Sequence, residues 1–227
     1  MTQHRFGIST KSVFQFFILT WSLQACRNEQ SFEGVIRYQH AIESCSPRYP
    51  LGMLKSTVDT ASTYYYRSGN YKWVNESALF AEDLYLAAEN RNYFKVGGGD
   101  VYYGEGSEQN EDILGYSMKE NQERILGYRC DLLDLVTRSR KDHSIVYRSI
   151  WYSPQIRIDS SAFSKLQYLS HDFIASKTHS IPLRIVMQNP EFSITWEAVS
   201  VEFQELNDSL FLMEGMEDAM PVNRLSF

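Results

Sequence analysis

The residue types that carry out most enzyme chemistry occur in this chain, but not in the spacing of a known catalytic or metal-binding motif. No Gly-x-Ser-x-Gly sequence is present to mark a nucleophilic serine. His171 and His179 lie eight residues apart, which is not a spacing of paired zinc ligands. Residues 105–123 are rich in acids but lack the ligand spacing of a calcium loop. The glycine run at 97–100 is not followed by the Lys-Ser/Thr of a phosphate loop, so it predicts a hairpin turn. We therefore expect a non-enzymatic protein with no cofactor and no metal site.

The first 25 residues have the organisation of a secretory signal peptide. Arg5 and Lys11 make the start basic, and an apolar run follows over residues 13–21. A helix over residues 12–25 would rise about 21 Å, which is shorter than the roughly 30 Å hydrocarbon core of a bilayer. The sequence thus predicts a signal peptide over residues 1–25 that is removed, rather than a permanent transmembrane helix.

The end of this segment, Leu23-Gln24-Ala25-Cys26, resembles a bacterial lipobox. The resemblance implies a diacylglycerol joined to the Cys26 thiol and usually a third acyl chain on its amine. Two or three chains hold a protein on a membrane far more firmly than one chain does. Residues 26–31 would then form a short tether. The alternative is ordinary secretion, with Cys26 at this position by chance.

Charge and cysteine content support an exported protein. Loss of Arg5 and Lys11 changes the formal net charge from −6 to −8. An acidic domain repels nucleic acid and anionic lipid, so nucleic acid is not an expected partner and membrane attachment requires the covalent anchor. The two remaining cysteines, Cys45 and Cys130, could form a disulfide in an oxidising compartment. Two separate thiols are the alternative.

Alternating apolar and polar residues predict a single, mainly β domain over residues 32–213, followed by a C-terminal tail over 214–227. A period of two is typical of half-buried strands. We expect strands at 32–40, 61–67, 71–74, 84–86, 93–96, 101–103, 125–136, 143–152, 181–187 and 192–203. Residues 78–88 could instead form one helix. About nine or ten antiparallel strands in meander order, with one or two covering helical segments, predict a curved sheet or half barrel.

Three segments need separate interpretation. In residues 192–203 the apolar set changes phase between Ala198 and Val199, which indicates a β-bulge. Residues 105–123 are polar and predict a solvated loop or a short helix. Residues 159–177 have apolar side chains at helical spacing and predict a helix or irregular cover over the sheet.

Several short sequences resemble the GLPGLI-type group of exported β-rich proteins of Bacteroidetes. They are Phe32-Glu33-Gly34-Val35-Ile36-Arg37-Tyr38, Ile125-Leu126-Gly127-Tyr128-Arg129-Cys130, Trp151-Tyr152-Ser153-Pro154, and Pro182-Leu183 with Glu197-Ala198 and Asp208-Ser209-Leu210-Phe211. The resemblance covers nearly the whole mature chain, although Ser180-Ile181-Pro182-Leu183 stands where the group has its Gly-Leu-Pro-Gly-Leu-Ile sequence. It implies a fold similar to the lipoprotein carrier LolA, in which a curved antiparallel sheet wraps helices.

The first functional hypothesis is a membrane-anchored envelope lipoprotein that binds a lipid or another apolar or amphipathic ligand against its sheet. Aromatic side chains would form the wall of such a site. The candidates are Tyr64, Tyr66, Trp73, Tyr147, Trp151 and Trp196. Each could instead be an ordinary core residue. We expect the protein on the outer membrane, facing the periplasm or the cell surface. The second hypothesis is an accessory lipoprotein that docks on an outer-membrane protein complex, and a hydrolase is the third.

Overall fold

The computed structural model describes residues 31–76, 80–97 and 99–222. The predicted signal peptide, Cys26 and most of the tether lie outside the described residues. All of the buried apolar residues lie between Phe32 and Met213, so the chain from Arg27 onward contains the whole described core. Within the described ranges, no helix has the length and apolar content needed to cross a membrane.

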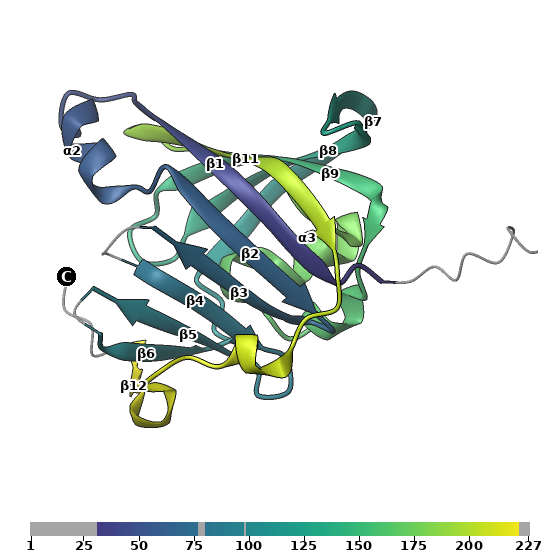
Figure 1. Ribbon diagram of the computed structural model, residues 1–227. Coiled ribbons are helices and arrows are strands. Elements are labelled where there is room, and N and C mark those ends of the chain that lie inside the picture. The colour runs from purple at the N-terminus through teal and green to yellow at the C-terminus, as the bar shows by residue number, and fades with distance from the viewer. Residues whose placement is uncertain (1–30, 77–79, 98, 223–227) are drawn as a thin grey trace, which may run out of the picture. The chain divides into compact units, whose positions relative to one another are not determined.

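The described residues form one large, curved, open sheet (Figure 1). Its strands are β1 (Gly34–Ser44), β2 (Ala61–Arg67), β3 (Asn70–Asn75), β4 (Phe80–Leu86), β5 (Arg91–Val96), β6 (Val101–Glu105), β7 (Glu111–Ile125), β8 (Tyr128–Ser139), β9 (Ile145–Arg157), β10 (Ser180–Gln188), β11 (Phe192–Phe203) and β12 (Met220–Pro221). Their order across the sheet is β12-β6-β5-β4-β3-β2-β1-β11-β10-β9-β8-β7. All neighbours are antiparallel except β12 and β6, which are parallel. The prediction of a mainly β, curved antiparallel fold is confirmed.

Short helices complete the described structure. The α-helices are α2 (Leu51–Thr57) and α3 (His171–Thr178), and the 3-10 helices are η1 (Ser160–Phe163), η2 (Tyr168–Ser170), η3 (Asp208–Phe211) and η4 (Met216–Asp218). The prediction of a helical cover within 159–177 is confirmed by η1, η2 and α3. The prediction that residues 78–88 contain a strand rather than a helix is confirmed by β4.

Local sequence explains the hairpins and the bulge. Ser68 and Gly69 both adopt positive φ, 49° and 88°, which matches the tight two-residue turn between β2 and β3. On β11, Ser200 pairs with Arg37 and Ala198 pairs with Tyr38, so Val199 is the extra residue of a bulge. The change of phase after Ala198 correctly predicted this bulge.

Two predictions are wrong in part. Of residues 105–123, predicted as a loop or a short helix, residues 111–123 instead belong to β7, which pairs only with β8 and forms one edge of the sheet. Most of its side chains are exposed, so its sequence is polar although its backbone is extended. Residues 125–136 are not one strand, because Leu126 and Gly127 form the turn between β7 and β8 with φ of 50° and 83°. A leucine at positive φ is uncommon and gives no sequence signal.

The sheet has an inner, concave face and an outer face. We call residues 158–179 the covering segment, and its α3 lies within the curve of the sheet (Figure 1). Ile174 of α3 packs against Leu133 and Ile150, which therefore lie on the inner face. Alternate residues of each strand lie on the outer face.

Residues 204–222, which we call the outer strap, cross the opposite side of β1 to β6. Leu206, Phe211 and Met213 pack there against Val35 and Leu84. The strap continues through η4 to β12, and Met220 pairs with Tyr102. The expectation of a C-terminal tail from residue 214 is therefore corrected for residues 214–222, because these residues pack on the sheet and end in a paired strand.

The two cysteines of the described chain are free thiols. Cys45 is exposed just after β1, whereas Cys130 is buried in β8. Of the two alternatives, the structure has two separate thiols. The strand register keeps the two cysteines apart. Cys45 follows Ser44, which pairs with Phe192 at the start of β11. Cys130 lies at the opposite end of the strands, next to the turn between β7 and β8.

Thiol labelling checks this arrangement. In the chain from Arg27 onward, we expect a maleimide to modify Cys45 within minutes and Cys130 only after unfolding, because burial raises the pKa of the Cys130 thiol and limits its access. Mass spectrometry of tryptic peptides measures both rates. If denatured protein without reductant showed neither thiol modified, Cys45 and Cys130 would be bridged.

Candidate functional site

The six aromatic candidates do not form a single wall. Tyr64, Tyr66, Trp73 and Trp196 lie on the inner face, in the same cross-strand alternation as the residues under α3. Tyr147 and Trp151 alternate with Ile150 and so lie on the outer face. Tyr147 is 55% exposed, and Trp151 lies beneath the guanidinium of Arg184, 5.3 Å from the ring centre. The prediction that Tyr147 and Trp151 belong to the wall is therefore wrong. Apolar residues occupy both alternating positions of β9, so its sequence did not show which side chains lie on the inner face.

Tyr66 belongs to the closed core rather than to an open surface. It is fully buried, and its ring stacks on Phe163 of the covering segment at 6.1 Å. Tyr71 and Tyr85 stack on the same phenylalanine, at 6.5 and 5.9 Å. This cluster attaches η1 to the inner face of β2, β3 and β4.

The next row along these strands is more open. Pairing aligns five inner-face residues directly across β2 to β6, in the order Tyr64, Trp73, Asp83, Phe94 and Tyr102. Tyr64 is buried, whereas the other four are partly exposed. We call these five residues the aromatic row. It places a single carboxyl group among four rings.

Asp83 is the residue of this row that the sequence did not single out. Part of its side chain is exposed, but its carboxyl group is enclosed, and burial raises the pKa of that group to about 7. Its Oδ1 is inaccessible to solvent and accepts no hydrogen bond from any described residue. Asn92, in the neighbouring row, also has an Oδ1 without a donor in the described chain. Buried polar atoms are normally bonded, so such atoms indicate a functional position.

The covering segment contacts the inner-face residues of this part of the sheet. Tyr168 of η2 contacts Phe94 edge-on at 6.1 Å, and His171 of α3 stacks on Tyr71 at 6.0 Å. Burial, with the positive charge of Arg148 nearby, lowers the pKa of His171 to about 4, so its ring is neutral at physiological pH. Burial raises the pKa of Tyr168 to about 12, with Asp83 adding to the effect.

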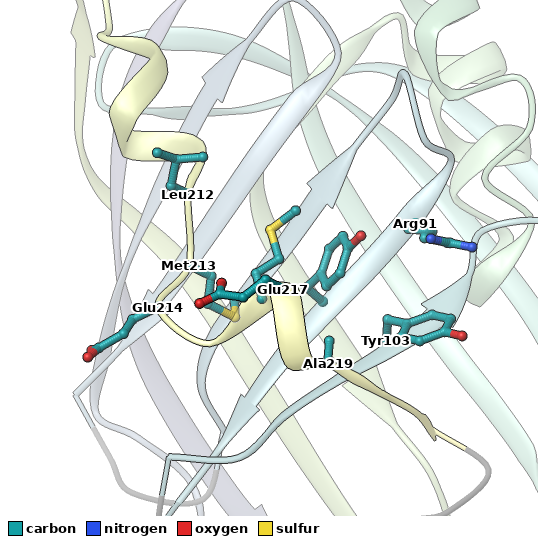
Figure 2. Close-up of a pocket in the computed structure, with 9 residues that line it drawn as sticks. Arg91, Tyr103, Leu212, Met213, Glu214, Glu217 and Ala219 are labelled. Atoms are coloured by element: carbon teal, nitrogen blue, oxygen red, sulfur yellow. The ribbon is translucent and has the colours of Figure 1, made fainter.

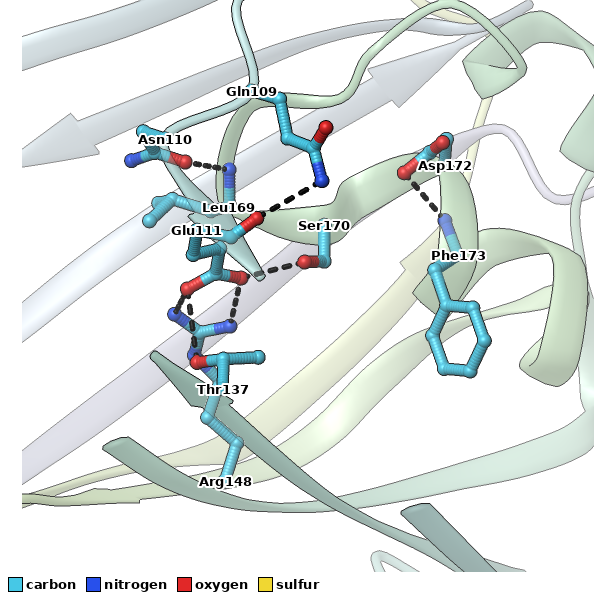
Figure 3. Close-up of polar contacts among 9 residues, drawn as sticks. All are labelled: Gln109, Asn110, Glu111, Thr137, Arg148, Leu169, Ser170, Asp172 and Phe173. Carbon is cyan, nitrogen blue, oxygen red and sulfur yellow. Dashed lines mark hydrogen bonds and ion pairs between the residues drawn. The ribbon is translucent and has the colours of Figure 1, made fainter. Parts of the chain in front are cut away.

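A buried ion pair holds the covering segment in place (Figure 3). Arg148 donates to both carboxylate oxygens of Glu111, at 2.6 and 2.7 Å, and both residues are under 10% exposed. Thr137 donates to Glu111 Oε2 at 3.0 Å, and Ser170 of the covering segment donates to Oε1 at 2.7 Å. Burial alone would raise the pKa of Glu111, but Arg148 and the two hydroxyl groups outweigh it and leave the pKa lowered. The network joins β7, β8 and β9 to η2.

Backbone contacts extend this attachment. The backbone N–H of Leu169 donates to Asn110 Oδ1 at 2.8 Å, and Gln167 N–H donates to the carbonyl of Gly106 at 2.6 Å. Leu169 and Ser170 both have positive φ, 51° and 56°. Non-glycine residues rarely adopt this conformation, so the surrounding bonds must stabilise it.

A hollow of about 620 Å³ lies on the outer face instead, between β5, β6 and the outer strap (Figure 2). Tyr93, Tyr103 and Met213 line its apolar part, and Arg91 lies over the Tyr103 ring at 4.8 Å. It is broadly open and contains none of the six predicted wall residues. The aromatic row is the better candidate site because Asp83 Oδ1 is inaccessible to solvent and accepts no hydrogen bond from the described residues.

A serine–histidine pair tests the hydrolase hypothesis. Ser62 Oγ lies 2.7 Å from His40 Nε2, and His40 Nδ1 lies 3.0 Å from the carbonyl oxygen of Asp59. Ser62 also borders a hollow of about 450 Å³. However, Ser62 is only 4% exposed, and burial lowers the pKa of His40. A serine nucleophile needs an accessible oxygen and a hole for the oxyanion, and Ser62 lacks the first of these. A second serine–histidine pair lies at the surface, where Ser160 Oγ is 2.8 Å from His179 Nδ1.

Comparison with models of known protein families and with curated proteins finds no match for this chain. Among the residues described, no group of three His, Cys, Asp or Glu side chains is placed to hold a metal ion.

Proposed function

We propose that this protein is a non-enzymatic envelope lipoprotein, anchored through acyl chains on Cys26, whose domain binds an amphipathic ligand on its inner face. The outer membrane, with the domain facing the periplasm or the cell surface, is the proposed location. The signal-like sequence before Cys26 supports the anchor.

One observation carries the ligand-binding part of the proposal. The inner face keeps several large apolar side chains that the covering segment does not fully bury. The partly exposed members are Trp73, Phe94, Tyr102, Ile185, Met187 and Trp196. Aromatic and aliphatic surface of this kind is stabilised when a ligand removes it from water, by about 25 cal/mol per Å².

Binding can be tested with the chain from Arg27 onward, which lacks the acyl anchor. We expect saturable binding of a fluorescent fatty amphiphile and recovery of lipid by solvent extraction of the native protein. Trp196→Ala on the inner face should weaken binding about fivefold or more, because a large contact is lost. Tyr147→Ala is the matched control, because Tyr147 lies on the outer face and is 55% exposed, and it should leave affinity unchanged. Equal effects of both substitutions would place the ligand elsewhere, and no saturable binding together with no extracted lipid would refute the proposal.

A second candidate function is docking on an outer-membrane protein complex. It is favoured by the open edge strand β7, which exposes Ile113, Leu114, Tyr116 and Met118. An exposed edge can accept a strand from a partner. A partner crosslinked to β7 in cell envelopes, combined with failure to bind any amphiphile, would favour docking over ligand binding.

A further inference from the structure

The aromatic row brings one acid into contact range of rings on two neighbouring strands. Asp83 on β4 is directly opposite Trp73 on β3 and Phe94 on β5. Directly opposed residues in antiparallel strands have Cβ atoms about 4.5–5.5 Å apart. Trp73 and Phe94 are therefore the cross-strand neighbours of Asp83. The Trp73 ring stacks on Tyr38 at 5.1 Å, and Tyr168 of the covering segment contacts Phe94.

Among the described residues, no positive charge contributes to the pKa shift of Asp83. None of the ion pairs of the described chain includes this residue, and no described group donates to its Oδ1. Burial is the sole cause of the raised pKa of its carboxyl group. By contrast Glu111, the other deeply buried acid, has an arginine and two hydroxyl donors. Asp83 thus has the environment of a carboxylate whose partner arrives from outside the fold.

We propose that Asp83, whose cross-strand neighbours are Trp73 and Phe94, binds an organic ammonium group, the cationic end of the amphipathic ligand. This inference rests on the proposed function and specifies the polar end of that ligand. Aromatic faces attract cations, most strongly where water is excluded, and the carboxylate supplies the opposite charge. Trp73 keeps its indole N–H bonded to Asn75 Oδ1 at 2.9 Å, so its ring orientation is fixed by the protein.

The chemistry favours an organic cation over a metal ion. Hard divalent cations require several oxygen ligands, and the row offers one carboxyl group among rings. The inner face also carries Trp196 and Ile185, which are directly opposite each other and partly exposed. An ammonium head at Asp83 leaves that surface for the apolar chain.

Calorimetric titration of the chain from Arg27 onward tests the inference. The probes are dodecyltrimethylammonium, dodecyl maltoside and dodecanoate, all below their micelle concentrations, and tetramethylammonium without a chain. We expect the ammonium amphiphile to bind about tenfold to a hundredfold more tightly than the other two, in line with a charge-assisted contact. Asp83→Asn should remove this preference. Asp100→Asn, an exposed acid in the β5–β6 turn, removes the same charge and should preserve it.

The outcomes separate the two proposals. If all three amphiphiles bound alike, or if Asp83→Asn kept the preference, the ammonium site would be refuted and the ligand-binding function would stand. If no amphiphile bound, the ligand-binding function would be refuted. In that case tetramethylammonium decides about the cation site. Binding that depends on Asp83 would support the site, and failure to bind would refute it as well.

Discussion

Glu111→Gln is expected to reduce the free energy of unfolding by about 3–5 kcal/mol at pH 7, which is the usual cost of breaking a buried ion pair. The substitution leaves the guanidinium of Arg148 buried without its carboxylate, and arginine cannot lose its proton. It also weakens the bond from Ser170 that attaches η2 to the sheet. Urea denaturation followed by circular dichroism measures the change.

Two further variants show whether the pair or the position is responsible. Asp112→Asn is the matched control, since Asp112 is the next residue of β7 and pairs with Arg138 and Arg140 at the surface. Surface pairs contribute little, so its loss should be much smaller. Arg148→Met should cost less at pH 5 than at pH 8, because the freed Glu111 can take up a proton. Equal losses for Glu111→Gln and Asp112→Asn would mean that the buried pair does not hold the covering segment.

Asp83→Asn is expected to stabilise the ligand-free protein at pH 8, by up to about 4 kcal/mol. The pKa of Asp83 is about 7 in the folded protein, against about 3.9 for an unfolded aspartate. Above pH 7 the folded protein must hold an ionised carboxyl group that burial disfavours. Asparagine has nearly the same shape and carries no charge. A more stable variant that binds less well would fit a residue kept for function.

The pH dependence provides a sharper form of this test. Between about pH 4 and pH 7 the folded state binds more protons at Asp83 than the unfolded state, so wild-type stability falls as pH rises through this window. Asp83→Asn removes that contribution, and its advantage should shrink by about 2–3 kcal/mol from pH 8 to pH 5. The phenols that face Asp83, of Tyr64, Tyr71 and Tyr168, have raised pKa values and stay neutral throughout. Unfolding at both pH values measures the difference, and an advantage independent of pH would show that Asp83 is ionised at low pH.

Much of the sheet could be predicted because its signals are local. Two strand-like runs with Ser68-Gly69-Asn70 between them identified the β2–β3 hairpin, although the turn is at Ser68 and Gly69 rather than at Gly69 and Asn70. One change of phase located the bulge at Val199. β7 was missed because an edge strand that is exposed on both faces has no apolar alternation. The packing of residues 214–222 was missed because it depends on a distant part of the sheet and on a strand of only two residues.

The candidate site was only partly predictable. Tyr64, Trp73 and Trp196 were identified as aromatic strand residues, but β4 has apolar residues in both phases, so the inner position of Asp83 gave no signal. Glu111 and Arg148 are separated by 37 residues, and their pairing follows from tertiary structure alone. The sequence of β9 likewise did not show that Tyr147 and Trp151 lie on the outer face of the sheet.

Photocrosslinking tests the central proposal of inner-face binding most directly. A dodecyl amphiphile with a diazirine in its chain would be irradiated with the chain from Arg27 onward, and the adducts mapped by mass spectrometry. We predict adducts at Trp73, Phe94 and Trp196, and their loss when unlabelled amphiphile competes. Adducts concentrated at outer-face residues such as Tyr147 and Trp151, or labelling that no competitor reduces, would contradict inner-face binding.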